Sequence, residues 1–153
     1  IDVVIHPQSI VHSLVEFTDR SLMAQMGLPD MRIPIAYALF YPERTALPFP
    51  STDLTKLGGL TFEPLKPKAF PLLAMAKEAL KEGGVAPAVL NVANEEAVSA
   101  FLTKRIGFLD IHKTVRKVLD AHPPRPIKTV DDVLLADRWA RLEAEKCIQR
   151  IAH

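Results

Sequence analysis

The sequence predicts a mixed α+β protein, with a short antiparallel β segment and one helix, an extended linker, and then a small four-helix bundle. Near the N-terminus, apolar and polar residues alternate, as in a strand with two different faces. Prolines gather in the middle of the chain, and beyond residue 70 the apolar period changes to about 3.6 residues. These changes predict three parts, residues 1–41, a linker at 42–69 and a bundle at 70–153.

The N-terminal part is expected to contain a strand and a hairpin. Residues 1–5 are apolar and mostly β-branched, which favours a strand. Residues 11–17 and 22–27 flank the polar turn at 18–21, which favours an antiparallel hairpin. Because the chain opens inside a strand pattern without an initiator Met, we expect it to continue a longer protein.

A short helix is expected from Met31 to about Tyr41. Asp30 is placed to cap this helix, and Pro34 falls in the first turn, where proline is tolerated. The following segment, 42–69, is rich in proline and glycine. Such a composition predicts an extended connector rather than a packed element.

Four amphipathic helices are expected downstream, and short turns between them favour an antiparallel bundle. The segments with helical apolar spacing are 70–84, 87–105, 111–122 and 129–151. Asp110 is predicted to cap the third helix. Thr129 and Asp132 have capping-box spacing before the fourth, and a Gly pair at 83–84 suits the end of the first.

Composition excludes several classes of function. A net charge of +1, from 19 basic and 18 acidic residues, argues against a nucleic-acid partner. The longest apolar run, 33–41, is far shorter than the roughly 20 residues that span a membrane, so no membrane partner is expected. Cys147 is the single cysteine, which excludes an internal disulfide and suits a cytoplasmic location. No Gly-rich nucleotide-binding loop occurs.

The segment IHPQSIVHS, at 5–13, carries the first candidate site residues. His6 and His12 are poor metal ligands, because Pro7 interrupts the strand between them and no acid or cysteine nearby completes a set. Ser9 and His12 as nucleophile and base would lack both a nucleophile elbow and an orienting acid. We favour a role as hydrogen-bond donors around a polar or phosphorylated small molecule.

The segment GLPDMRIPI, at 27–35, carries the second set. Asp30 and Arg32 fit either helix capping with a surface ion pair or a functional site, and the sequence favours neither. Met31 has a flexible thioether that suits contact with a flat apolar ring, although methionine also fills ordinary cores.

The helical part offers weaker candidates. Asn91, Asn94 and Glu95 share one helical face, where hydrogen bonds between helices are the favoured reading. Cys147 lies in an apolar stripe and is expected to be an inert core residue. Trp139 lies opposite that stripe and is expected to pack on either a partner or the linker.

Three segments together resemble the second half of the 1-deoxy-D-xylulose 5-phosphate reductoisomerase family. These segments are IHPQSIVHS, then GLPDMRIPIAYAL followed by PER, then LNVANEEAVSAFL, and the resemblance covers essentially all 153 residues. Two positions depart from the family pattern, Val92 in place of Ala and Ile33 at a position often occupied by Thr. Neither is a proposed chemical group.

The resemblance implies an enzyme of non-mevalonate isoprenoid synthesis. Such an enzyme is a homodimer that converts 1-deoxy-D-xylulose 5-phosphate, a small-molecule sugar phosphate, to 2-C-methyl-D-erythritol 4-phosphate with NADPH and a divalent cation (Mg, Mn or Co). The NADPH domain, metal ligands and phosphate contacts would precede residue 1. We therefore expect these 153 residues alone to be inactive, with 1–41 as the end of a catalytic and dimerisation domain.

The resemblance also implies which residues face the reaction. Ser9, His12, Pro29 and Met31 would line the pocket for substrate and cofactor. His12 is the one candidate for proton transfer, and no metal ligand is expected in this chain. The alternative from another class is a non-catalytic helical interaction module preceded by a β arm.

Overall fold

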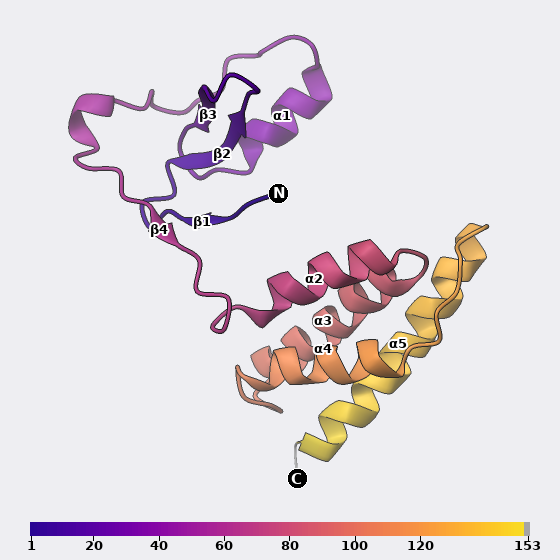
Figure 1. Ribbon diagram of the computed structural model, residues 1–153. Coiled ribbons are helices and arrows are strands. Elements are labelled where there is room, and N and C mark those ends of the chain that lie inside the picture. Colours follow the sequence, from indigo (N-terminus) through magenta and orange to yellow (C-terminus); the bar gives the residue numbers. More distant parts are fainter. Residues whose placement is uncertain (152–153) are drawn as a thin grey trace. The chain divides into compact units, whose positions relative to one another are not determined.

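The computed structural model describes residues 1–151, which form two compact units (Figure 1). The first unit is Ile1–Leu65, and the second begins at Lys66. The first contains short antiparallel strands and a helix, and the second contains four helices, so the predicted α+β class is confirmed. The division into a catalytic part, a linker and a bundle at residues 42 and 70 stays a proposal.

The predicted hairpin is present as β2 (Val11–Glu16) and β3 (Leu22–Met26). The strands pair antiparallel, with Glu16 opposite Leu22 at the turn. In the turn, the Asp19 carboxylate accepts hydrogen bonds from the Ser21 backbone N–H at 2.9 Å and from its hydroxyl at 2.6 Å. These bonds fix the chain reversal and therefore the register of the two strands.

The predicted strand at 1–5 is shorter than expected and has a partner that the sequence did not indicate. Strand β1 (Val4–Ile5) pairs antiparallel with β4 (Glu63–Pro64). Beside this pair, the Gln8 side chain and Thr61 exchange hydrogen bonds of 2.8 to 3.2 Å. The proline-rich segment also contains a 3₁₀ helix, Leu54–Lys56, so it is not extended throughout.

Helix α1 spans Arg32–Phe40 and ends before Pro42, as the proline positions predict. The predicted cap is displaced by one residue, because Met31 occupies the N-cap position and makes no side-chain cap bond. Asp30 nevertheless serves the first turn, since its carboxylate accepts the Arg32 backbone N–H at 2.9 Å. The helix therefore begins at Arg32, one residue later than the expected start at Met31.

All four predicted downstream helices are present. Their bounds are α2 (Pro71–Glu82), α3 (Ala86–Leu102), α4 (Asp110–Ala121) and α5 (Val130–Ile151). Helix α2 ends at Gly83, which has a φ of +75° and donates its N–H to the Ala79 carbonyl at 3.0 Å.

Caps were predicted at the N-termini of α4 and α5. The capping box of α5 is confirmed, because the Asp132 carboxylate accepts the Thr129 N–H at 2.8 Å and the Thr129 hydroxyl receives the Asp132 N–H at 3.4 Å. The predicted Asp110 cap is wrong. Asp110 is the first residue of α4, Leu109 is the N-cap, and the Asp110 carboxylate accepts the Gly107 N–H and the Lys113 ammonium instead.

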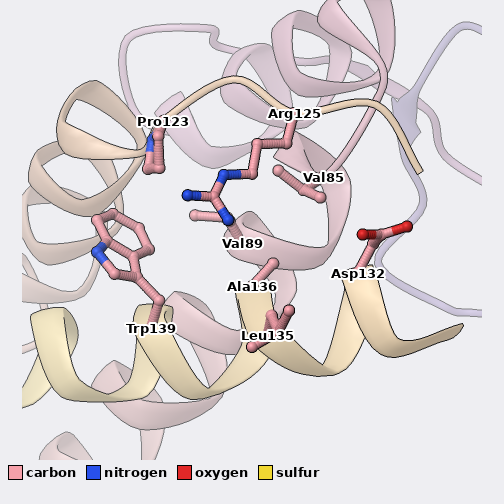
Figure 2. A pocket seen from close by; sticks show the side chains of 8 residues that line it. All are labelled: Val85, Val89, Pro123, Arg125, Asp132, Leu135, Ala136 and Trp139. Atoms are coloured by element: carbon pink, nitrogen blue, oxygen red, sulfur yellow. The ribbon is translucent and has the colours of Figure 1, made fainter. Parts of the chain in front are cut away.

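The segment between α4 and α5 is tied to the start of α3 (Figure 2). The Val85 N–H donates to the Arg125 carbonyl at 3.0 Å. A Cβ on Gly84 would lie 2.3 Å from that same oxygen, and Gly84 has a φ of +53°. Glycine is therefore required at 84 both for space and for backbone conformation.

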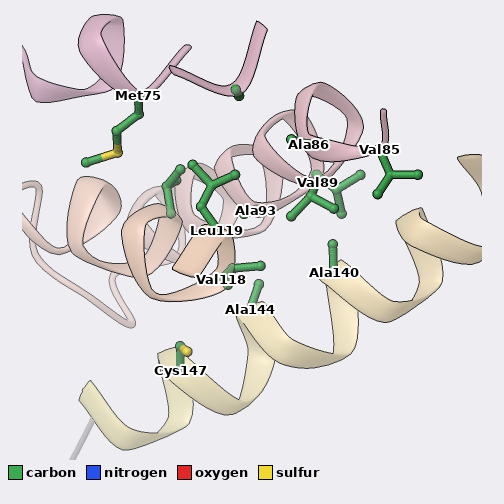
Figure 3. Packing of buried hydrophobic residues seen from close by; sticks show 13 residues of the cluster. Met75, Val85, Ala86, Val89, Ala93, Val118, Leu119, Ala140, Ala144 and Cys147 are labelled. Carbon is green, nitrogen blue, oxygen red and sulfur yellow. The ribbon is translucent and has the colours of Figure 1, made fainter. Parts of the chain in front are cut away.

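Helix α3 packs against each of the other three helices, and small residues dominate the core of the unit (Figure 3). Ala93, Ala140 and Ala144 are fully buried, so the backbones of α3 and α5 approach closely. Cys147 is a free, buried thiol within this same cluster, as its position in the apolar stripe predicts. Within residues 1–151, no helix has the length and apolarity needed to cross a lipid bilayer.

Candidate functional site

The four predicted site residues lie together around one pocket of the first unit, with a volume of about 660 Å³. Ser9 and His12 come from the start of the hairpin, and Pro29 and Met31 come from the turn that precedes α1. We call this the Met31 pocket. The other lining residues are Gln25, Leu28, Asp30, Ile33, Pro34, Tyr37 and Arg44.

Ser9 is held in an uncommon backbone conformation. Its φ is +52°, a region that L-residues other than glycine seldom adopt. The Ser9 N–H donates to the His6 carbonyl at 3.0 Å, which closes a tight turn at Pro7 and Gln8. The turn brings the Ser9 side chain to the rim of the Met31 pocket.

His12 is the extra residue of a β-bulge. Val11 lies opposite Met26 and Ser13 lies opposite Gln25, so two consecutive residues of β3 face three of β2. Bulges turn a side chain away from regular alternation and occur often beside active sites. The imidazole of His12 borders the Met31 pocket and has no hydrogen-bond partner within residues 1–151, so its nitrogens are free to meet a ligand.

Asp30 and Arg32 form a tight ion pair at the edge of the pocket. The Arg32 guanidinium donates to both Asp30 oxygens, with its shortest bond at 2.6 Å. These bonds, together with the Arg32 backbone N–H, lower the pKa of Asp30 to about 2. The guanidinium also lies 4.4 Å above the ring of Phe49. The pair thus supports the first turn of the helix, and Asp30 also lines the pocket, so the structural and the functional reading both stay open.

Met31 and Pro29 supply the apolar wall of the pocket. Met31 is 72% exposed, so its thioether is available to a ligand rather than filling a core. Residues at positions 30, 33, 34 and 37 line the pocket, which is the i, i+3, i+4, i+7 spacing of one helix face. That spacing also marks Tyr37, which was not among the predicted site residues.

Arg44 and Gln25 were also missed. The Arg44 guanidinium lies 4.3 Å above the Tyr37 ring and borders the pocket. Arg44 ends the segment PER, and Gln25 lies just before GLPDMRIPI. No periodic spacing in the sequence identifies either of them as a pocket residue. Their place follows from the cross-strand register and from the chain path after α1.

His6 has a structural environment. Its Nδ1 lies 2.8 Å from the Thr61 carbonyl, and its ring stacks on Phe62 with a centroid distance of 4.6 Å. Among residues 1–151, no three His, Cys, Asp or Glu side chains gather in a way that could hold a metal ion.

The polar cluster on α3 links helices. Asn91 donates to Glu95 at 3.0 Å, and Arg141 of α5 donates to Glu95 at 3.2 Å and to Glu96 at 2.6 Å. Trp139, which was expected to pack on a partner or the linker, instead packs partly buried against the helical core.

The Met31 pocket can therefore bind a flat, partly apolar group beside a polar one. Its wall is apolar at Pro29, Met31 and Ile33. Its lining also offers a hydroxyl from Ser9 and an imidazole from His12. Such a combination suits orientation of a small molecule that has both a ring and oxygen atoms.

Comparison with known proteins gives one consistent result. Residues 26–143 match the sequence model of the DXP reductoisomerase C-terminal domain. Curated relatives named 1-deoxy-D-xylulose 5-phosphate reductoisomerase include those of Acetivibrio thermocellus, 49% identical over 149 residues, and Chlorobium limicola, 55% identical over 148 residues. Each alignment covers 97% of this chain and 39% of the relative.

Solved structures agree with the sequence matches. The reductoisomerase from Zymomonas mobilis in complex with NADPH has a TM-score of 0.89 and 47% identity, covering 97% of this chain and 39% of that chain. A DOX-P reductoisomerase with fosmidomycin and magnesium has a TM-score of 0.87 and 39% identity, with the same two coverages. The chain thus spans about two fifths of the length of these relatives.

Proposed function

This chain belongs to the DXP reductoisomerase family, and we propose that it is the C-terminal part of an enzyme that converts 1-deoxy-D-xylulose 5-phosphate to 2-C-methyl-D-erythritol 4-phosphate with NADPH. The observation that carries the proposal is the grouping of Ser9, His12, Pro29 and Met31 around one pocket. Residues from two separate segments meet there, and the segments match relatives of this name along their length.

The residues of the chain fit a nicotinamide ring and a sugar phosphate. NADPH would supply a hydride when bound. Pro29 and Met31 would hold the ring by apolar contact, since an exposed thioether adapts to a flat surface. Ser9 and His12 would hydrogen-bond the oxygens of the substrate, and His12 would hold or deliver a proton through its imidazole.

Residues 1–151 offer no set of ligands for the divalent cation of the whole enzyme. The part of the chain that the structure describes has no group of three or more metal-ligating side chains. We therefore assign the cation, Mg, Mn or Co, to residues outside this chain, and we expect the 153 residues alone to be inactive.

We also propose a cytoplasmic homodimer whose contact includes the β2–β3 hairpin. Val15, Leu22 and Met23 on these strands are more than half exposed and apolar. Within the first unit the two strands pair with each other and with no third strand. Unpaired strand edges with apolar side chains favour association with a second sheet. Light scattering on the full-length protein tests this, and a monomer would overturn it.

The test of the proposed function uses the full-length protein and substitutions at Met31. Met31→Ala should lower NADPH-dependent turnover about tenfold and raise the KM for NADPH, because the apolar wall is lost. Met31→Leu keeps the apolar volume and should retain most activity. His12→Gln should change the pH profile of kcat if the imidazole moves a proton. Unchanged kinetics in Met31→Ala would remove this residue from the pocket's function.

A further inference from the structure

A second pocket lies entirely within the helical unit and is independent of the proposed activity. Its volume is about 220 Å³, and we call it the Trp139 pocket (Figure 2). Its walls come from the start of α3, the segment after α4 and the first half of α5. The lining residues are Val85, Val89, Pro123, Arg125, Asp132, Leu135, Ala136 and Trp139.

The Trp139 pocket is apolar apart from two charged residues, and the two differ in their bonding. The Oδ2 atom of the Asp132 carboxylate accepts the N–H groups of Lys128 at 2.9 Å and Thr129 at 2.8 Å. These bonds hold the pKa of Asp132 below its usual value. Arg125 takes part in none of the ion pairs found within residues 1–151. The pocket thus carries one guanidinium that is in no ion pair of residues 1–151, and one carboxylate that is held in place by backbone N–H groups.

The guanidinium of Arg125 reaches into the pocket toward Trp139, while Asp132 lies on the other side (Figure 2). The backbone that presents it is fixed. The Val85 N–H binds the Arg125 carbonyl at 3.0 Å, and Gly84 leaves room for that carbonyl. Prolines at 123, 124 and 126 fix further backbone angles. A ligand would therefore meet a backbone that is already ordered, which lowers the entropy cost of binding.

We propose that the Trp139 pocket binds a small aromatic carboxylate. The planar guanidinium matches a carboxylate through two parallel hydrogen bonds. The indole of Trp139 and the side chains of Val89 and Leu135 offer apolar contact to a ring. The pocket volume of about 220 Å³ leaves room for one ring and its carboxylate.

Trp139 is the single tryptophan of the chain, so its fluorescence reports on this pocket alone. The 153-residue chain is titrated with benzoate and, separately, with benzamide, which has nearly the same shape but no charge. We expect a saturable fluorescence change with benzoate and at least tenfold weaker binding of benzamide. A linear, unsaturated response to benzoate, or equal binding of the two compounds, overturns the proposal.

A pair of substitutions tests the role of the cation. Arg125→Gln should weaken benzoate binding at least tenfold and leave benzamide binding unchanged. Arg138→Gln is the matched control, because Arg138 adjoins Trp139 in the sequence and is exposed, as Arg125 is, but does not line the pocket. Equal loss in both variants, or no loss in Arg125→Gln, contradicts the assignment. If circular dichroism shows that Arg125→Gln does not fold, the comparison of benzoate with benzamide on the unmodified chain decides alone.

Discussion

Replacing Thr114 by valine is expected to stabilise the helical unit. Thr114 is completely buried in α4, and its hydroxyl has no hydrogen-bond partner among residues 1–151. A buried hydroxyl without a partner costs free energy, because it gives up its bonds to water and receives none in return. Valine has nearly the same shape, so the change removes that cost without opening a cavity.

The expected gain follows from the burial of this one group. An unpaired buried polar group costs about 1–3 kcal/mol, and Thr and Val have similar helix propensities. Thr114→Val should therefore raise the free energy of unfolding by about 1–2 kcal/mol. Val115 is also completely buried and gives the reverse control. Val115→Thr should lower the free energy of unfolding by a similar amount, because it buries a hydroxyl without a partner. Thr114→Ser keeps the hydroxyl, removes a methyl group and should cost about 1 kcal/mol.

Urea denaturation followed by far-ultraviolet circular dichroism measures these differences in the 153-residue chain. Equal slopes among the variants would show that each change acts on stability rather than on the denatured state. A Thr114→Val variant no more stable than the unmodified chain, alongside a destabilised Val115→Thr variant, would contradict the expected cost of the buried hydroxyl. The hydroxyl would then have a partner that residues 1–151 do not supply.

Two further predictions concern the backbone and the acid side chains. Gly84→Ala should lower the free energy of unfolding by about 2 kcal/mol or more. A left-handed φ costs about 1–2 kcal/mol for alanine, and the new Cβ would also clash with the Arg125 carbonyl. An unchanged midpoint of urea unfolding would contradict this. The pKa of Asp30, about 2 beside Arg32, should move toward its ordinary value of 3.8 in Arg32→Gln, as measured by NMR titration. Because the folded-state pKa is the lower one, the pair stabilises the fold above about pH 4, and this contribution disappears as the pH falls through about 2.

Local patterns predicted most of the secondary structure. Apolar spacing of 3.6 residues located all four helices of the second unit, because each one buries a single face against α3 or its neighbours. The hairpin was predictable because alternation and the Asp19 turn act over a few residues. In contrast, β1 and β4 pair across almost 60 residues of chain, and two-residue strands leave no periodic signal.

The two helix caps at Asp30 and Asp110 show why boundaries are harder to predict. Both acids bind backbone N–H groups near a helix start, as their chemistry requires. However, Asp30 lies one residue before the N-cap and Asp110 one residue after it. Asp30 reaches forward to the Arg32 N–H, whereas Asp110 reaches back to the Gly107 N–H, so residue type alone does not fix the first helical residue.

Four residues of the Met31 pocket were named from the sequence, their role in binding stays a prediction, and the geometry that joins them was not predictable. Ser9, His12, Pro29 and Met31 were selected by resemblance, and the structure brings all four to one pocket. The bulge that redirects His12 has no signature in the alternation, which would place His12 on the same face as Leu14 and Glu16. Arg44 reaches the pocket through a chain path that depends on the fold as a whole.

The two units differ in how many hydrophobic side chains they bury, and we expect them to differ in their resistance to proteases. In the first unit, Ile10 is the single hydrophobic side chain classed as buried within residues 1–65, and every other buried hydrophobic residue lies beyond Lys66. Backbone that lacks a core opens readily and becomes accessible to cleavage. Digestion of this chain should therefore leave a persistent helical piece that begins near residue 66 and retains Trp139. That piece would be the natural starting point for crystallisation of the Trp139 pocket.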